Sequence, residues 1–509
     1  MKKLIKLICF ALVMILCVSG VGCVDQKPTV YTITYNLDGG KNHADNPSSY
    51  TEQDQIVLKA PSKTGFVFVE WRKDGVKIEK IERGSKENLT LTAVWQEDIP
   101  VLPPVEPPVV ETGRQIQMVG QTFKGNDVVY PDSLWNTPEW NYEPTLDFGM
   151  EDTEGVKGIF YTSVPYEGKP TRVAAYIGFP KNASATQKVP AMVLVHGGLG
   201  TAVPQWVKYW NDLGYAAISM DTEGAEPIDG ISNNNTVDYH IENNRYANDQ
   251  VYCSGPSNPG KYYDYQKDVT EQWMYHATSS VIAATSLMAS FDCVDIQKIG
   301  MTGISWGSVI TSTVIGYDDR ITFAMPIYGG ISLSQSYSAE KDAHFNQTSK
   351  DRWDNLEALK QSNCKTFYVT SDADYHFSLD IASRCASATN SWATYINGFT
   401  HGQAQGVYQI DLPNFANLMT GKATDFVTVT HQPTKENPVI KVEKHGNAKI
   451  ESVWIYYTSD TDLGTSAKWF TKFVSYDDLT EYTLTLPECS TAYVRIRYNG
   501  DHTVCSYLF

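Results

Sequence analysis

A serine in a turn between glycines is the residue best suited to nucleophilic chemistry. Ser305 lies at the centre of residues 303–307, Gly-Ile-Ser-Trp-Gly, a G-x-S-x-G pentapeptide. A strand-like segment, 298–302, precedes it, and a stretch of small and β-branched residues follows and ends at Gly316. A strand–turn–helix of this kind strains the serine backbone and lifts Oγ above the end of a sheet. Because the pentapeptide alone is common, this flanking pattern is what predicts a nucleophile.

A carboxylate and a histidine follow the serine along the chain. The strand-like run 366–370 leads into Ser-Asp-Ala-Asp, which ends at Asp374, and His401 comes next between two glycines. Hydrolytic triads on α/β sheets have this order, each residue following a strand. We expect His401 to accept the Ser305 proton and Asp374 to hold the imidazole. Asp372 is the competing candidate for the acid, and Asp374 is favoured.

Two backbone N–H groups are expected to face the oxygen of a bound carbonyl group. One belongs to Trp306, directly after the nucleophile, and the other to Gly198 in the turn 196–200, His-Gly-Gly-Leu-Gly. We interpret His196 as a brace of this turn. Since the chain itself supplies nucleophile, base and oxyanion donors, we expect neither a metal nor a cofactor.

These residues need a mostly parallel sheet with helices on both faces to bring them together. Strand-like runs and helical patterns alternate along residues 114–424, which predicts an α/β-hydrolase fold. The expected strands are 172–180, 189–195, 214–221, 298–302, 324–328 and 366–370, and a long helix is expected over 268–289. Residues 425–509 alternate in short strands, which predicts a small β-sandwich in which Cys489 and Cys505 could form a disulfide.

One long insertion interrupts the alternation. Residues 225–262 are rich in Asn, Gly, Pro and Tyr and lie between a strand and a helix, on the side where the site is expected. A lid or substrate-binding loop and a surface excursion are both open interpretations.

The N-terminal part is typical of an exported protein. Residues 1–23 have a basic start, an apolar stretch and a small-residue exit, as in an export signal, and end in Val-Gly-Cys. Cys23 is therefore a candidate for lipidation, with simple secretion and a retained, uncleaved signal anchor as the alternatives. A short β module is expected over residues 30–97. Residues 98–113 contain five prolines and predict a stiff, extended linker.

The overall charge restricts the partners. The 509 residues carry a formal net charge of −17, so the chain has no electrostatic footprint for nucleic acid or for an anionic membrane surface. Contact with a membrane is expected only through the possible lipid on Cys23. Neutral polymers such as polysaccharides fit this charge.

Two stretches resemble known families. The segments YTITYNLDGG, GFVFVEW and LTLTAVW within residues 30–97 resemble the Listeria–Bacteroides repeat, also called the internalin B-type repeat. The segments EQWMYHA at 271–277, MTGISWG at 301–307 and IYGG at 327–330 resemble bacterial acetylxylan-esterase-like proteins, on the dienelactone-hydrolase and prolyl-oligopeptidase side of the α/β-hydrolases. This second resemblance implies serine esterase chemistry on acetylated sugars.

The sequence therefore predicts an exported serine esterase at a bacterial cell envelope, acting on acylated polysaccharide or oligosaccharide. A serine peptidase of the prolyl-oligopeptidase type shares the elbow and triad, but usually adds a β-propeller, for which the segment before residue 114 is too short. A non-catalytic surface adhesin is the third possibility, and the complete Ser–Asp–His set argues against it.

Overall fold

The computed structural model describes residues 28–64, 66–97, 127–147, 152–227, 241–243, 252–259, 262–342 and 347–509. The predicted export signal with Cys23 and the predicted linker 98–113 lie outside the described residues, as does part of the insertion 225–262. The chain divides into two compact units, Met1–Val101 and Leu102–Phe509.

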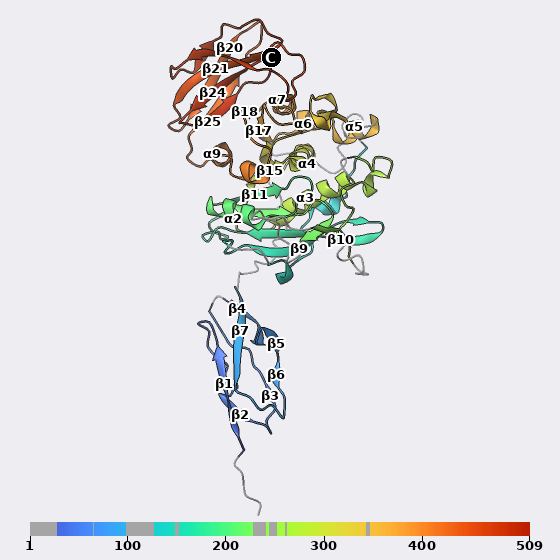
Figure 1. The fold of residues 1–509 in the computed structure, drawn as a ribbon, viewed down its shortest axis with the longest axis vertical. Coiled ribbons are helices and arrows are strands. Elements are labelled where there is room, and N and C mark those ends of the chain that lie inside the picture. The colour runs from blue at the N-terminus through green and yellow to red at the C-terminus, as the bar shows by residue number, and fades with distance from the viewer. Residues whose placement is uncertain are drawn as a thin grey trace, which may run out of the picture. The chain divides into compact units, whose positions relative to one another are not determined.

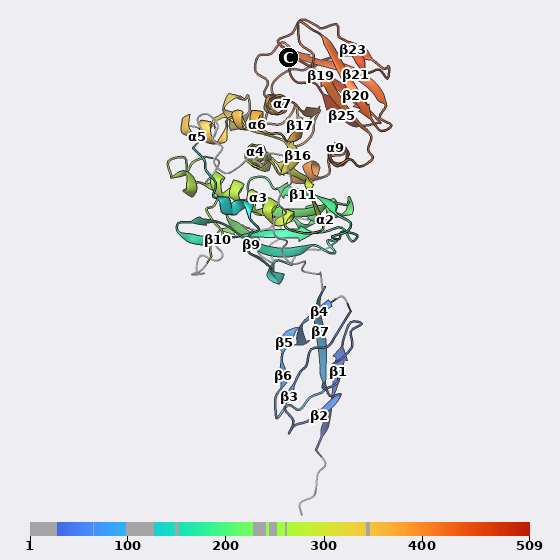
Figure 2. The ribbon, with the colours of Figure 1, turned by 180° about the vertical axis from the view of Figure 1, so that it is seen from behind.

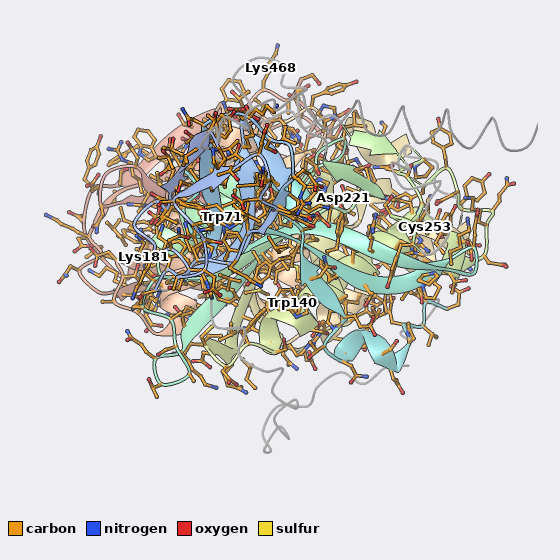
Figure 3. The ribbon with its side chains drawn as sticks, turned by 90° about the horizontal axis from the view of Figure 1, so that it is seen from below. Trp71, Trp140, Lys181, Asp221, Cys253 and Lys468 are labelled. Atoms are coloured by element: carbon orange, nitrogen blue, oxygen red, sulfur yellow. The ribbon has the colours of Figure 1, made fainter. Side chains whose placement is uncertain are left out.

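The first unit is a small β module, drawn in blue in Figure 1. Its five-stranded sheet has the order β2-β1-β7-β4-β5, and a separate pair is formed by β3 and β6. The strands are β1 (Val30–Asn36), β2 (Ser49–Thr51), β3 (Ile56–Val57), β4 (Phe66–Lys73), β5 (Val76–Ile78), β6 (Lys80–Ile81) and β7 (Leu89–Glu97). Trp71, labelled in Figure 3, is 2% exposed, and its indole N–H donates to the Lys59 carbonyl. The Trp95 indole N–H donates to the Leu37 carbonyl, so both indoles belong to the packing of the module.

A sheet of thirteen strands runs through the second unit (Figures 1 and 2). In spatial order its strands are β22 (Phe470–Ser475), β21 (Ile450–Thr458), β24 (Thr491–Tyr498), β25 (His502–Cys505), β18 (Trp392–Ile396), β17 (Lys365–Ser371), β16 (Ile321–Ile327), β15 (Val294–Ile304), β11 (Val189–Val195), β12 (Ala216–Met220), β10 (Lys169–Gly178), β9 (Lys157–Tyr166) and β8 (Trp140–Tyr142). The central strands, from β12 to β18, are parallel. Their carboxyl ends therefore meet at one edge of the sheet, where open α/β sheets bind ligands.

Helices cover both faces of the parallel strands. α3 (Trp273–Ala289), α4 (Trp306–Val314) and α7 (Leu379–Ala388) contribute to one core, and α2 (Pro204–Asp212) and α9 (Asp411–Thr420) to the other. β11 is buried throughout because its residues alternate between these cores, Val193 in the first and Met192 in the second. This arrangement confirms the predicted α/β-hydrolase class.

The remaining helices and strands are short. They are η1 (Asp132–Trp135), η2 (Pro144–Leu146), η3 (Val269–Glu271), η4 (Leu333–Gln335), η5 (Ala339–Asp342), α5 (Gln347–Trp353), α6 (Glu357–Gln361), α8 (Gln403–Val407), and the pair β13 (Ala225–Pro227) and β14 (Ile241–Asn243). β13 and β14 pair within the predicted insertion. None of the helices among the described residues is long and apolar enough to cross a bilayer.

The C-terminal strands form two layers, drawn in red in Figure 1. One layer is a separate sheet of β19 (Phe426–His431), β20 (Val439–His445) and β23 (Glu481–Thr483). The other layer continues the central sheet, because β25 pairs with β18 where Ala393 faces Cys505. The suggested disulfide between Cys489 and Cys505 is not formed. Both thiols are free, and Cys505 is buried where its sulfur accepts from the Tyr395 N–H at 3.4 Å.

Candidate active site

Ser305 occupies a sharp turn between a strand and a helix. β15 ends at Ile304 and α4 begins at Trp306, so Ser305 alone makes the turn, with φ 57° and ψ −121°. Non-glycine residues rarely adopt this conformation, and it persists only where the surroundings fix it. The Ser305 N–H donates to the Ile327 carbonyl at 2.9 Å, which ties the turn to the neighbouring strand β16.

The glycines of the pentapeptide are required by close backbone approach. A Cβ at Gly303 would lie 2.1 Å from the Gly307 carbonyl oxygen, and a Cβ at Gly307 would lie 2.1 Å from the Val195 carbonyl oxygen. Neither position has room for a side chain, and the atoms in the way are backbone. The start of α4 is thereby pressed against the end of β11, which brings Ser305 to the carboxyl edge of the sheet.

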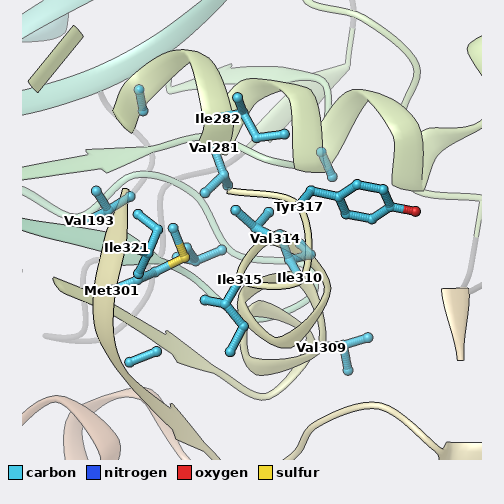
Figure 4. Close-up of a cluster of buried hydrophobic side chains, with 14 of the residues drawn as sticks. Val193, Val281, Ile282, Met301, Val309, Ile310, Val314, Ile315, Tyr317 and Ile321 are labelled. Carbon is cyan, nitrogen blue, oxygen red and sulfur yellow. The ribbon is translucent and has the colours of Figure 1, made fainter. Parts of the chain in front are cut away.

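The rest of α4 is held by apolar packing. Figure 4 shows Val309, Ile310 and Val314 of this helix in one buried cluster with Val281 of α3 and Met301 of β15. Burying such side chains is worth about 1.5 to 3 kcal/mol each. This packing opposes any relaxation of the strained turn at Ser305.

His401 and Asp374 are directly paired. His401 Nδ1 lies 2.8 Å from Asp374 Oδ2, and the Asp374 side chain is buried. Asp374 Oδ1 accepts the backbone N–H groups of His376 and Phe377 at 2.9 and 3.1 Å. These three hydrogen bonds fix the carboxylate, which in turn orients the imidazole.

The competing acid has a different task. Asp372 accepts from the Asn397 amide at 2.8 Å and from the Gly398 N–H at 3.1 Å. It supports the loop that leads from β18 to His401. The structure therefore places Asp374, rather than Asp372, against His401.

Aromatic rings surround the imidazole. The ring centroids of Tyr328 and Phe377 lie 4.7 and 6.1 Å from that of His401, and that of His376 lies 5.1 Å away. The Tyr328 hydroxyl donates to the Thr400 carbonyl at 2.6 Å, so Tyr328 also holds the loop next to His401. Tyr328 directly follows β16 and has a φ of 61°. In the sequence, Tyr328 belongs to the segment 327–330 that carries part of the family resemblance, and no local pattern indicates this supporting role.

The two residues predicted to supply the oxyanion donors, Gly198 and Trp306, lie side by side. A Cβ at Gly198 would approach the Trp306 indole Cδ1 to 3.0 Å, and one at Gly197 would approach the Ser305 Cβ to 3.2 Å. The 196–200 turn thus lies directly beside the first residues of α4. The N-terminus of a helix favours negative charge, so this corner suits an oxyanion.

Ser305 and His401 open onto the same cavity, of about 260 Å³. Its lining comes from the elbow, the glycine turn and the His401 loop. The residues are His196, Gly197, Gly198, Leu199, Gly200, Thr201, Val203, Ile304, Ser305, His401, Gly402 and Gln403. Predicted nucleophile, base and one oxyanion residue therefore meet at a single hollow.

His196 braces the glycine turn, as the sequence suggested. Its Nε2 accepts the Thr222 N–H at 3.0 Å, so Nδ1 carries the proton and donates to the Gly197 carbonyl at 2.7 Å. Burial lowers the pKa of His196 to about 4, against the raising effect of the Gly197 hydrogen bond. The ring is therefore neutral at pH 7, and this tautomer is the one that the two bonds require.

Two aromatic side chains pack against the Trp306 ring. Its ring centroid lies 5.5 Å from that of Tyr262 and 5.9 Å from that of Trp273. The Trp273 indole N–H donates to the Thr222 carbonyl at 2.7 Å, which connects these aromatic side chains to the segment that braces the glycine turn.

Within the described residues, no three His, Cys, Asp or Glu side chains gather in a way that could hold a metal ion.

Two family models match the chain. Residues 31–94 match the Listeria-Bacteroides repeat domain, and residues 132–335 match the acetyl xylan esterase family. Both predicted resemblances are confirmed. The second match contains Gly198, Ser305 and Trp306 and ends before Asp374. No match was found among curated proteins.

Parts of several solved structures are similar to this chain at low sequence identity. An acetyl xylan esterase from Paenibacillus sp. R4 is 16% identical with a TM-score of 0.39, over 57% of this chain and 90% of that one. An acetyl xylan esterase from Thermoanaerobacterium sp. JW/SL YS485 is 14% identical with a TM-score of 0.38, over 56% and 93%. A puromycin-hydrolysing peptidase from Mycobacterium tuberculosis is 16% identical with a TM-score of 0.38, over 55% of this chain but 41% of the peptidase.

Proposed function

We propose that this protein is a serine carboxylester hydrolase that removes O-acetyl groups from polysaccharides. The match of residues 132–335 to the acetyl xylan esterase family supports an esterase or another hydrolase. The observation that carries the finer proposal is the meeting of Ser305 with the His401–Asp374 pair at one cavity. This arrangement supports roles for the three residues as nucleophile, base and orienting acid.

The proposed reaction proceeds through an acyl-enzyme. Ser305 Oγ attacks the ester carbonyl carbon while His401 Nε2 takes the hydroxyl proton. The oxyanion accepts hydrogen bonds from the Trp306 and Gly198 N–H groups. The tetrahedral intermediate collapses, and the bond between the acyl carbon and the sugar oxygen breaks. His401 returns the proton to this oxygen, and the sugar leaves as an alcohol. Water then attacks the acyl-serine by the same route and releases acetate.

Cavity size and charge both favour a small acyl group on a large neutral substrate. At about 260 Å³ the cavity lies below the usual range for ligand pockets, which begins at about 300 Å³. It can take a short acyl group and part of one sugar, so the rest of a polymer would lie outside. The net charge of −17 disfavours polyanionic substrates.

We further propose that the protein works outside the cell, held at a bacterial envelope through lipid on Cys23. The export-type residues 1–23, the repeat and the proline-rich segment 98–113 support this order of anchor, spacer and enzyme. Cys23→Ser tests the anchor. If Cys23 carries lipid, the variant is released to the medium or stays unprocessed, whereas identical fractionation and processing of both forms would contradict the anchor.

The activity is tested with three substrates in parallel. We expect the purified protein to hydrolyse 4-nitrophenyl acetate and to release acetate from acetylated xylan, and to leave a proline-amide substrate intact. Ser305→Ala serves as the matched negative control in each assay. Cleavage of the amide without ester hydrolysis would replace the esterase by the peptidase alternative. Lack of turnover on all three, in a folded protein, would favour a binding role.

A further inference from the structure

Glu223 is a buried carboxylate that takes no part in the proposed reaction. It follows β12 and is 5% exposed. Its Oε1 accepts the Leu199 backbone N–H at 3.1 Å and the Asn258 side-chain amide at 3.2 Å. Within the described residues, no Lys, Arg or His is paired with it. Burying a carboxylate with neutral partners alone is unfavourable for folding, so the position calls for a compensating function.

Leu199, which donates to Glu223, is itself in an unfavourable state. It has a φ of 61°, and the residue is 90% exposed at the rim of the cavity. A left-handed backbone costs a residue with a Cβ about 1 to 2 kcal/mol. An apolar side chain exposed to this degree also gains nothing from burial. The hydrogen bond to Glu223 opposes relaxation of this residue, together with the turn hydrogen bond from the Gly200 N–H to the Gly197 carbonyl.

Leu199 follows Gly198, the proposed oxyanion donor, in the chain. The direction of the Gly198 N–H depends on how the 196–200 turn is held on both sides. On the side before Gly198, His196 is fixed by the Thr222 N–H. On the side after it, the Leu199 N–H is fixed by Glu223. Thr222 and Glu223 are neighbours, so one rigid segment after β12 supports the whole turn.

We infer that Glu223 is a positioning residue, which holds the strained turn at Leu199 and thereby aims the Gly198 N–H at the oxyanion. The inference rests on the proposed esterase function. Glu223 does not line the cavity and touches no reacting atom. Its effect passes through one backbone hydrogen bond, and a misdirected oxyanion donor acts on the transition state more than on substrate binding.

The test distinguishes the loss of the hydrogen-bond acceptor at position 223 from the loss of side-chain volume there. Glu223→Met fills similar space without an acceptor, and Glu223→Ala covers the case in which methionine does not fit. Glu223→Gln keeps an oxygen at the Oε1 position. Removing an oxyanion donor altogether lowers kcat by about 10² to 10³, so a loosened one should lower it by about 10-fold to 100-fold. We expect this loss in Glu223→Met with little change in KM, and recovery to within about threefold in Glu223→Gln.

A matched control addresses general loss of structure. Asp147 accepts the Gly158 N–H of β9 at 2.9 Å. In the sheet, β9 is separated from β15, the strand before Ser305, by β11, β12 and β10. Asp147→Ala should leave kcat unchanged. Fluorophosphonate labelling of Ser305, carried to completion, gives the fraction of folded active sites in each variant. Separately, backbone hydrogen exchange in a peptide that covers residues 196–200 should be faster in Glu223→Met than in the wild type.

The outcomes are distinguishable. A wild-type protein that neither turns over esters nor labels at Ser305 would refute the proposed function itself. An active wild type with unchanged kcat in Glu223→Met would overturn the positioning role alone. Equal losses in Glu223→Met and Glu223→Gln would also overturn it, because the acceptor would then not be what matters.

Discussion

Asp374 Oδ2 lies 2.8 Å from His401 Nδ1, while Asp372, two residues earlier, is bonded to Asn397 and Gly398. Two carboxylates in one short loop therefore have separate tasks. The first orients the proposed base, and the second holds the loop that carries it.

Asp374→Asn should lower kcat far more than Asp372→Asn. An amide facing Nδ1 can stabilise the wrong imidazole tautomer, which costs about 10⁴ in kcat in a serine-protease triad. Asp372→Asn keeps one oxygen acceptor and loses the other, so it weakens the loop that carries His401 without touching the His401–Asp374 pair, and we expect a loss below about tenfold. Steady-state kinetics of both variants on 4-nitrophenyl acetate provide the measurement. A larger loss at Asp372 would mean that the acid is misassigned.

Two glycines beside the nucleophile should respond differently to alanine. In Gly307→Ala the new Cβ would lie 2.1 Å from a backbone carbonyl oxygen, so we expect destabilisation by about 3 kcal/mol or more. In Gly198→Ala the Cβ meets the Trp306 indole at 3.0 Å, and a small shift relieves the contact. That variant should fold and lose kcat by about tenfold, since the oxyanion turn moves. Thermal melts and kinetics distinguish the two, and a stable Gly307→Ala protein would contradict the close packing.

The stability of the protein should depend on pH through Glu223. Burial raises the pKa of Glu223 from 4.5 to about 7, while the bonds from Asn258 and Leu199 lower it. A carboxyl group whose folded pKa is raised stabilises the folded state below its ordinary pKa, and this contribution is lost as pH rises through about 7. The loss between pH 4.5 and 7 amounts to roughly 3 kcal/mol.

Glu223→Gln cannot ionise and should not show this loss. We expect its free energy of unfolding in urea to exceed that of the wild type by up to roughly 3 kcal/mol at pH 8 and to be similar at pH 4.5. The other titratable groups are the same in both proteins, so their contributions largely cancel in the difference. An equal difference at both pH values would show that Glu223 does not titrate in this range.

Much of the site could be predicted because its parts are local. Ser305, Asp374 and His401 each follow a strand, and the glycines around Ser305 and Gly198 mark turns in the sequence itself. The order of the serine, the aspartate and the histidine along the chain then indicated which role each one has. The choice between Asp374 and Asp372 required the structure, because both residues follow β17 within one loop.

The supporting residues could not be found in this way, since their partners are distant in the sequence. Glu223 meets Leu199 across the sheet edge, and Tyr328 meets His401 from another strand. Nothing in the local sequence of either indicates such a contact. The pairing of Ala393 with Cys505 likewise joins distant segments, so the continuation of the central sheet into the C-terminal strands was not foreseen. Cys505 is buried at this pairing, and its thiol and that of Cys489 are both free, so the suggested disulfide was wrong.

The central claim is that Ser305 is the nucleophile, and the most direct measurement is the kcat of Ser305→Ala on 4-nitrophenyl acetate, with circular dichroism to confirm folding. The account predicts a folded protein whose kcat is lower by a factor of about 10³ or more. A folded Ser305→Ala protein that turns over the ester at a rate near that of the wild type would contradict it.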